Sequence, residues 1–114
     1  MDDCIFCRIA AGKLASDIVY EDNDVVAFTD INPEAPTHLV VIPRRHIANL
    51  SEAVATDAEL VGKVVLAAAT LAKQRGLDVA GYRLVANTGK EAGQSVDHIH
   101  FHLLGGRFMS LPPG

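Results

Sequence analysis

Three of the five histidines of the chain stand at alternate positions in one short segment: His98, His100 and His102. The positions between and after them are apolar: Ile99, Phe101 and Leu103. Alternation with period two is typical of a half-buried β-strand, in which every second side chain points to the same face. Neighbouring imidazoles on that face are about 6.6 Å apart, from roughly 3.3 Å per residue. This spacing lets them act together on one small group, either a metal ion or a phosphorus atom.

Imidazole is the side chain that exchanges protons near neutral pH, acts as a nucleophile and binds metals. A single histidine on a strand is usually structural. Three in register are harder to explain that way, because histidine has no special preference for strands and each buried imidazole needs a hydrogen-bond partner. We therefore expect a functional site on this segment.

The segment His98-Ile99-His100-Phe101-His102-Leu103-Leu104 resembles the signature of the histidine triad (HIT) superfamily. Four further blocks are similar to its Hint branch, the histidine-triad nucleotide-binding proteins, and occur in the same order: 30–38, 41–47, 93–96, and the ending formed by Gly105-Gly106-Arg107 with Pro112-Pro113-Gly114. The resemblance covers essentially the whole chain. It implies a HIT-like α+β fold and a homodimer.

The resemblance also implies an activity, the hydrolysis of purine nucleoside 5′-phosphoramidates at the P–N bond through a nucleotidyl-histidine intermediate. It makes His100 the nucleophile, oriented by the main-chain carbonyl of His98. Ser95 and His102 would stabilise the developing charge, and His38 and His102 would handle the proton of the leaving amine. No cofactor is required for this chemistry.

The expected partner is a small purine nucleotide of the AMP or GMP type. Asp30 would take the ribose, because two vicinal hydroxyls can donate to two carboxylate oxygens. The loop 88–95 has two glycines that could turn amides toward an anion, and Gln94 and Ser95 would add side-chain donors. The resemblance assigns nucleotide binding to Ile5, Phe6, Ile9, Phe28, Asp30, Ile31, Asn87, Gly93, Gln94, Ser95, His100 and His102.

Cys4 and Cys7 form a C-x-x-C pair close to the N-terminus. A redox motif would follow a strand, and two cysteines do not indicate a disulfide framework in a cytoplasmic chain. The pair is therefore either two idle thiols or half of a structural zinc site, which needs two more ligands. Some bacterial proteins that the chain resembles bind zinc through such a pair and two histidines, which here are His46 and His98.

Composition excludes several classes of protein. The 114 residues indicate a single domain, 1–114. The net charge of −4 argues against a non-specific nucleic-acid binder, which needs a basic face. No segment approaches the ~20 apolar residues of a membrane span. We expect no nucleic-acid or membrane partner and a cytoplasmic location.

The elements that must position these residues can also be read from the sequence. Period-two or continuous apolar patterns predict strands at 18–21, 25–29, 38–43, 82–87 and 97–104. A short helix should follow Asp2 or Asp3 and stop at Gly12. A long one should begin with the capping box Thr56 to Glu59 and end before Gly76. The expected fold is thus an antiparallel sheet of about five strands with one long and one short helix.

Two other functions fit the same residues. A nucleotide-binding regulatory module with little turnover would keep the pocket without the chemistry. A zinc-dependent hydrolase would use the aligned histidines as ligands and keep an open water site. In the Hint branch the tail, 105–114, reaches the partner subunit's active site, and Leu111 stands where many relatives have Trp.

Overall fold

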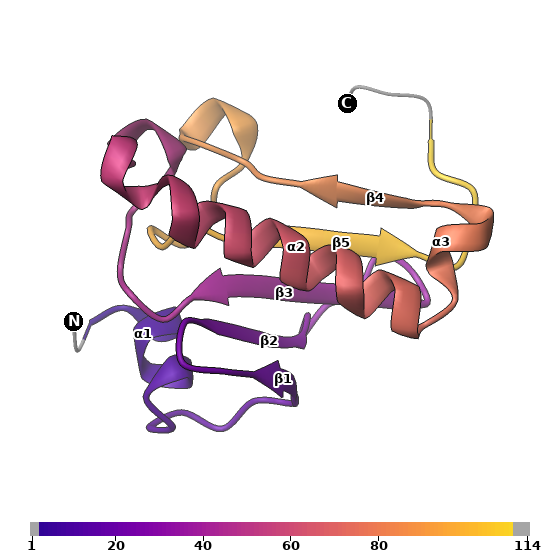
Figure 1. The fold of residues 1–114 in the computed structure, drawn as a ribbon, viewed down its shortest axis with the longest axis horizontal. Coiled ribbons are helices and arrows are strands. Elements are labelled where there is room, and N and C mark those ends of the chain that lie inside the picture. The colour runs from indigo at the N-terminus through magenta and orange to yellow at the C-terminus, as the bar shows by residue number, and fades with distance from the viewer. Residues whose placement is uncertain (1–2, 111–114) are drawn as a thin grey trace.

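Five strands form one antiparallel sheet in the computed structural model, which describes residues 3–110. The strands are β1 (Ile18–Glu21), β2 (Val25–Thr29), β3 (Thr37–Pro43), β4 (Tyr82–Val85) and β5 (Phe101–Gly105). Their order across the sheet is β1-β2-β3-β5-β4, and each neighbouring pair is antiparallel (Figure 1). The predicted α+β fold and sheet are confirmed.

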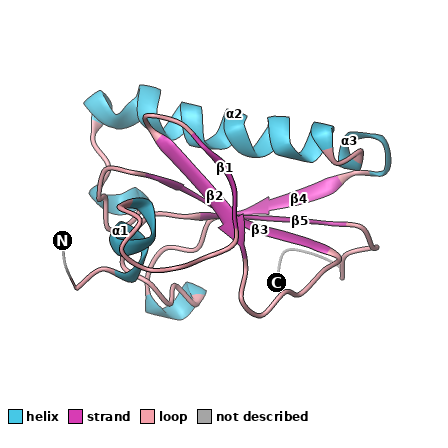
Figure 2. Cartoon of the chain, turned by 90° about the horizontal axis from the view of Figure 1, so that it is seen from below, coloured by secondary structure: helices cyan, strands magenta, loops and turns pink. Residues whose placement is uncertain are grey.

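The long helix α2 (Ala58–Gln74) covers one face of the sheet (Figure 2). Because side chains alternate along a strand, Leu39 and Val41 of β3 face this helix, together with Leu103 of β5. Val40 and Ile42 of β3 face the opposite way and pack against the short helix α1 (Ile5–Ala10). The sheet therefore separates two apolar cores, and the α1 side is the thinner one.

Helix α1 has a different cap from the one predicted. The Cys4 thiol, not the Asp3 carboxylate, accepts the Cys7 amide at 3.3 Å and caps the first turn, and Asp2 lies outside the described residues. Cys4 itself has extended backbone angles, as an N-cap residue must. The predicted stop is confirmed, since Gly12 has φ +74° and donates its amide to the Ile9 carbonyl at 3.0 Å.

Helix α2 also begins differently. A 3₁₀ turn at Ala55–Asp57 precedes it, and the predicted capping box from Thr56 to Glu59 does not form. The Asp57 carboxylate instead accepts the Val54 amide at 2.9 Å and pairs with Arg45. The helix ends as predicted, with Gly76 at φ +74°, and the short helix α3 (Leu77–Ala80), which was not predicted, follows.

Only the second half of the triad segment is in the sheet. Strand β5 begins at Phe101, where Phe101 pairs with Val41, so His98 and His100 precede the ladder. The prediction of a strand from 97 is wrong because β3 ends at Pro43, which has no amide hydrogen to continue the ladder. Similarly, β4 stops at Val85 instead of residue 87.

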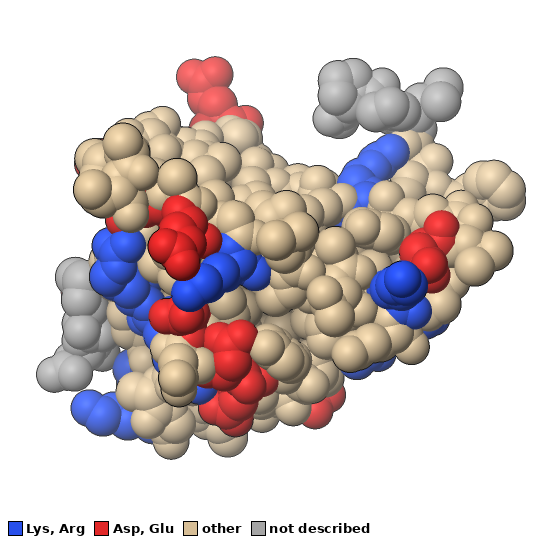
Figure 3. Space-filling model, viewed as in Figure 1, with Lys and Arg blue, Asp and Glu red and all other residues tan. Residues whose placement is uncertain are grey.

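No helix within residues 3–110 has the length and apolarity needed to cross a membrane. On the face shown in Figure 3, acidic and basic side chains lie next to one another and do not form a continuous basic surface. Leu111 and the Pro-Pro-Gly ending lie outside the described residues, so the predicted role of the tail stays a prediction.

Candidate active site

A cavity of about 500 Å³ lies on the α1 side of the sheet. This volume is within the ~300–1,000 Å³ range of small-molecule sites. Its lining includes nine residues that the sequence assigned to nucleotide binding: Ile5, Phe6, Ile9, Phe28, Asp30, Ile31, Ser95, His100 and His102. The α1 helix, the end of β2 and the triad segment thus meet at one hollow.

The inner wall of this cavity is aromatic. The ring of Phe6 packs edge-on against Phe28 at 5.3 Å between centroids and against His100 at 5.1 Å. Ile31 lies at the cavity with 91% of its surface exposed, and Ile5 is 46% exposed. Apolar groups this exposed next to a hollow are available to cover a flat ring such as a purine.

Other residues of the lining were missed by sequence reasoning: Leu14, Ala15, Ser16, Thr29, Asn32, Val40 and Val96. Val40 pairs with Phe28 across β2 and β3, so the two side chains share a face. In the sequence Val40 sits inside a continuous apolar run, in which the two faces of a strand cannot be told apart. The loop residues around Leu14 gave no periodic signal.

His100 is held in one tautomer. Its Nδ1 lies 2.7 Å from the main-chain carbonyl of His98, and a carbonyl can only accept, so the ring hydrogen is on Nδ1. The Nε2 atom of the neutral ring therefore carries the lone pair. His100 is 4% exposed and lies against the cavity. This is the arrangement expected of a nucleophile that a third group orients.

His38, His102 and Asp30 form a second group at the other end of the triad. The Nε2 of His38 is 2.9 Å from the Nδ1 of His102 and 3.3 Å from an Asp30 oxygen, which is 3.7 Å from the same Nδ1. Burial, and then the neighbouring His100 and His38, lower the pKa of His102, whereas Asp30 opposes the shift. His102 is therefore neutral at pH 7.

These three side chains could in principle hold a cation, because their ligand atoms converge. The hydrogen bond on the other side of His38 argues against it. The Glu34 amide donates to His38 Nδ1 at 3.0 Å, so the hydrogen of the neutral ring is on Nε2 and blocks that atom as a ligand. We therefore interpret the group as a hydrogen-bonded relay.

The loop before the triad is held by hydrogen bonds within the protein. The Gln94 amide nitrogen donates to the carbonyls of Ala48 and Val96, and its oxygen accepts the Gly89 amide. Both amide hydrogens of Gln94 are thus used within the protein, and Gln94 braces the loop. Gly93 has φ +83° and donates its amide to Lys90. Neither residue lines the cavity, in contrast to Ser95.

Asn87 lies elsewhere. It lines a smaller hollow of about 290 Å³ on the far side of His102, together with His38, Arg83 and Arg107. His102 is part of both hollows. Asn87, Gly93 and Gln94 therefore do not line the cavity that the other predicted nucleotide contacts share.

The four predicted metal ligands converge on a third point. The Nδ1 of His98 is 3.4 Å from the sulfur of Cys4 and 3.4 Å from that of Cys7, and the Nδ1 of His46 is 3.3 Å from the Cys7 sulfur. All four ligand atoms lie within 4.8 Å of one another. In a tetrahedral zinc site, bonds of ~2.3 Å to sulfur and ~2.05 Å to nitrogen imply S···N edges of about 3.5 Å. The donor set and its spacing fit zinc.

The protonation chemistry of this cluster agrees with a metal site. His98 Nε2 lies 2.8 Å from the Pro43 carbonyl, which fixes its hydrogen there and leaves the Nδ1 lone pair toward the thiols. Burial lowers the pKa of His98 to about 4. Burial and Cys4 raise the pKa of Cys7 to about 11, so a bound cation would have to displace a proton.

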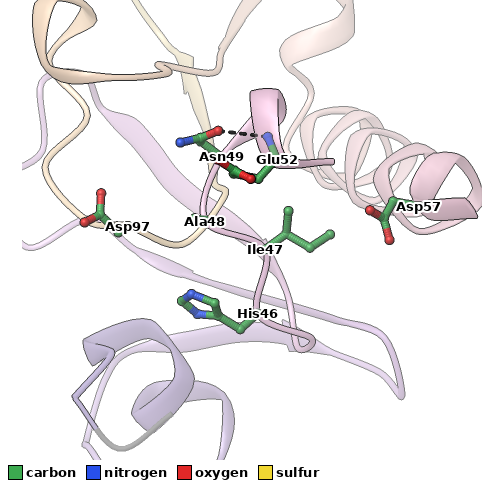
Figure 4. Close-up of a pocket in the computed structure, with 7 residues that line it drawn as sticks. All are labelled: His46, Ile47, Ala48, Asn49, Glu52, Asp57 and Asp97. Atoms are coloured by element: carbon green, nitrogen blue, oxygen red, sulfur yellow. Dashed lines mark hydrogen bonds between the residues drawn. The ribbon is translucent and has the colours of Figure 1, made fainter. Parts of the chain in front are cut away.

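His46 also borders a separate hollow of about 510 Å³ (Figure 4). Its lining is polar and partly acidic: His46, Ile47, Ala48, Asn49, Glu52, Asp57 and Asp97. Asn49 accepts the Glu52 amide at 3.1 Å and so caps the turn on one side of this hollow. Among the described residues, no cluster of ligand atoms joins His98, His100 and His102, so the aligned histidines do not share a metal.

Comparison with known proteins decides the family. The HIT domain matches residues 11–109. The chain belongs to the HIT domain family. A HIT-like protein of Synechococcus elongatus is 49% identical over 113 residues, which cover 99% of this chain and 98% of that protein.

Two further relatives of this HIT protein have named activities. The purine nucleoside phosphoramidase of Escherichia coli is 44% identical over 106 residues, 93% of this chain and 89% of the relative. The crystal structure of a HIT family hydrolase from Legionella pneumophila has 48% identity and a TM-score of 0.96, covering 98% of this chain and 100% of the other. The resemblance seen in the sequence is confirmed over nearly the whole length.

Proposed function

We propose that this HIT protein is a hydrolase that cleaves the P–N bond of purine nucleoside 5′-phosphoramidates. The observation that carries the proposal is the hydrogen bond of His100 Nδ1 to the His98 carbonyl, because it leaves the Nε2 lone pair free beside a cavity of suitable size. The activity named for the Escherichia coli relative supports the substrate class.

The first step is attack of His100 Nε2 on phosphorus. A P–N bond to His100 forms, the P–N bond to the amine breaks, and the amine leaves with a proton. His102, whose hydrogen lies on Nε2 if the relay from His38 is intact, is placed to donate to a phosphoryl oxygen or to the leaving nitrogen. The exposed Ser95 at the cavity adds a hydroxyl donor.

The second step regenerates the free enzyme. Water attacks the nucleotidyl-histidine and gives a proton to His102, which replaces the proton that left with the amine. The bond from phosphorus to His100 breaks, and the nucleoside monophosphate leaves. The His98 carbonyl serves both steps, since it stabilises the Nδ1 hydrogen of His100 whether or not Nε2 is bonded to phosphorus. The nucleoside would lie against Phe6 and Phe28, with its ribose at Asp30.

We also propose a structural zinc ion at Cys4, Cys7, His46 and His98. Zinc would supply a cross-link between α1 and the segments that follow β3 and precede β5, where His46 and His98 lie, and it has no part in the proposed reaction. A homodimer is proposed as well. Strand β4 is a free edge of the sheet, and such an edge invites pairing with a second copy.

The test is turnover of adenosine phosphoramidate, with rapid quenching and mass analysis of the protein. Wild-type protein should carry an added nucleotide that maps to His100. His100→Ala should lose at least ~10⁴-fold in kcat, the scale seen when a covalent nucleophile is removed, and should still bind AMP. Near-wild-type turnover by His100→Ala, or an adduct on another residue, would refute the mechanism. Binding without turnover in wild-type protein would favour the regulatory alternative.

A further inference from the structure

Arg107 holds the middle of the loop that connects Asp30 with His38. It lies in the turn after β5, where its Nε and Nη2 both donate to the Glu34 carbonyl, at 3.0 and 2.8 Å. Its Nη1 donates to the Phe108 carbonyl at 2.9 Å. Two donors from one rigid guanidinium on a single carbonyl fix the position and the tilt of that peptide group.

The backbone on both sides of this contact is built to bring the two segments together. Thr37 pairs with Gly105 where the β3–β5 ladder ends. Gly106 follows with φ +94°, and a Cβ there would lie 2.9 Å from Cβ of Pro36. Only glycine lets the turn pass so close to the loop. Arg107 then reaches Glu34 from the next position.

The same Glu34 residue sets the hydrogen positions of two histidines. Its amide donates to His38 Nδ1 at 3.0 Å, so His38 carries its hydrogen on Nε2. That hydrogen can be donated to His102 Nδ1 at 2.9 Å, which leaves the hydrogen of His102 on Nε2. Asp30 does not decide between the two states, because the same carboxylate oxygen lies 3.3 Å from His38 Nε2 and 3.7 Å from His102 Nδ1 and can accept a hydrogen from either atom.

We propose that Arg107 is a positioning residue for His102, which it keeps in the tautomer with the hydrogen on Nε2. It does so through the backbone of Glu34, whose carbonyl accepts from Arg107 and whose amide donates to His38. Arg107 itself touches neither the nucleotide cavity nor the reacting atoms. The inference rests on the proposed function only where it concerns turnover. If Arg107 is removed, the loop loosens, His38 can reverse its tautomer, and His102 can turn its hydrogen toward His38 or Asp30.

The expected kinetic effect follows from populations. Only molecules with the hydrogen on His102 Nε2 can donate it in the reaction. The kcat of Arg107→Ala relative to wild-type protein should therefore equal the fraction of molecules that keep this tautomer. KM should stay near its wild-type value, because the nucleoside is held at the other cavity, of which Arg107 is not part.

The tautomer can be measured without substrate, from the ¹⁵N chemical shifts of the imidazole nitrogens in histidine-labelled protein at pH ~8, above the ordinary imidazole pKa of about 6.5. The signals of His102 are identified by their loss in His102→Gln. Wild-type protein should show a hydrogen on Nε2, and Arg107→Ala a mixture. Arg107→Lys, which keeps one donor, should lie between them, and added guanidinium should restore Arg107→Ala.

Arg83→Ala is the matched control. Arg83 lines the same hollow of about 290 Å³, but it donates to the Ser110 carbonyl, at 3.1 Å, and not to Glu34. It should leave the His102 tautomer and kcat unchanged. A folded Arg107→Ala or Arg107→Lys with the wild-type tautomer would overturn the inference. A tautomer shift in a protein without turnover would refute the proposed function and leave the inference standing.

Discussion

Replacing Cys7 with Ser removes one thiolate from the proposed zinc site and changes little else. The side chains have similar shapes, and the half-buried Cys7 sulfur lies 3.3 Å from His46 Nδ1 and 3.4 Å from His98 Nδ1. A serine hydroxyl stays protonated and binds zinc poorly. Mutating residues that hydrogen-bond to the ligands of a metal site typically lowers the affinity for the metal by 10–100-fold. Loss of a ligand should therefore cost at least about 100-fold.

The expected loss of zinc affinity can be converted into a change in melting temperature. At saturating zinc, a 100-fold weaker site lowers the free energy of unfolding by about 2.7 kcal/mol. A domain of 114 residues has an unfolding entropy of about 0.24 kcal/mol/K, from ~2.1 cal/mol/K per residue. The melting temperature of Cys7→Ser should thus lie about 11 °C below that of the wild type.

The assay is calorimetry of both proteins with excess zinc and with a chelator. In chelator the difference in melting temperature between the two proteins should nearly vanish, because neither protein then has the cross-link. Wild-type protein purified without a metal-affinity tag should contain about one zinc per chain. The kcat of folded Cys7→Ser should change little, since the carbonyl of His98 remains in place. An equal gap in both buffers, or less than a tenth of a zinc per chain, would refute the reasoning.

Three further predictions concern the pocket, the assembly and the response to pH. Asp30→Ala should weaken ribonucleotides by ~1–3 kcal/mol and hardly affect 2′,3′-dideoxy analogues; equal losses in titration calorimetry would contradict the ribose contact. Sedimentation at micromolar concentration should give roughly twice the 12.1 kDa chain mass, and a clean monomer would contradict the dimer. Burial lowers the pKa of His102 below its ordinary 6.5. Below about pH 6.5 the unfolded chain binds a proton at this histidine that folded His102 does not bind. The free energy of unfolding should therefore decrease as the pH is lowered below about 6.5. His102→Gln should make that slope shallower in denaturant titrations, and an unchanged slope would show that His102 is not the cause.

Local patterns predicted what depends on local physics. Period two placed Ile99, Phe101 and Leu103 toward α2 and the histidines toward the other face, and glycine predicted where α1 and α2 end. These features depend on side-chain alternation and on backbone angles within a few residues.

What failed depends on distant partners. The start of β5 is set by Pro43 on the neighbouring strand, and Gln94 is engaged by the carbonyl of Ala48. The cap at Cys4 uses a thiol that is held by a histidine 94 positions later. Neither register nor such contacts can be inferred from the pattern around a residue, and here the resemblance to a family supplied the pairing of cysteines with histidines.

His98 divides its atoms between two tasks. Its main-chain oxygen orients His100, whereas its ring faces the two thiols and the Pro43 carbonyl. The chemistry thus constrains the backbone at this position, and the cluster constrains the side chain. A protein engineer could therefore exchange Cys4, Cys7, His46 and His98 for a well-packed apolar set and retain the nucleophile. The folding of such a chain would not depend on the proposed zinc ion.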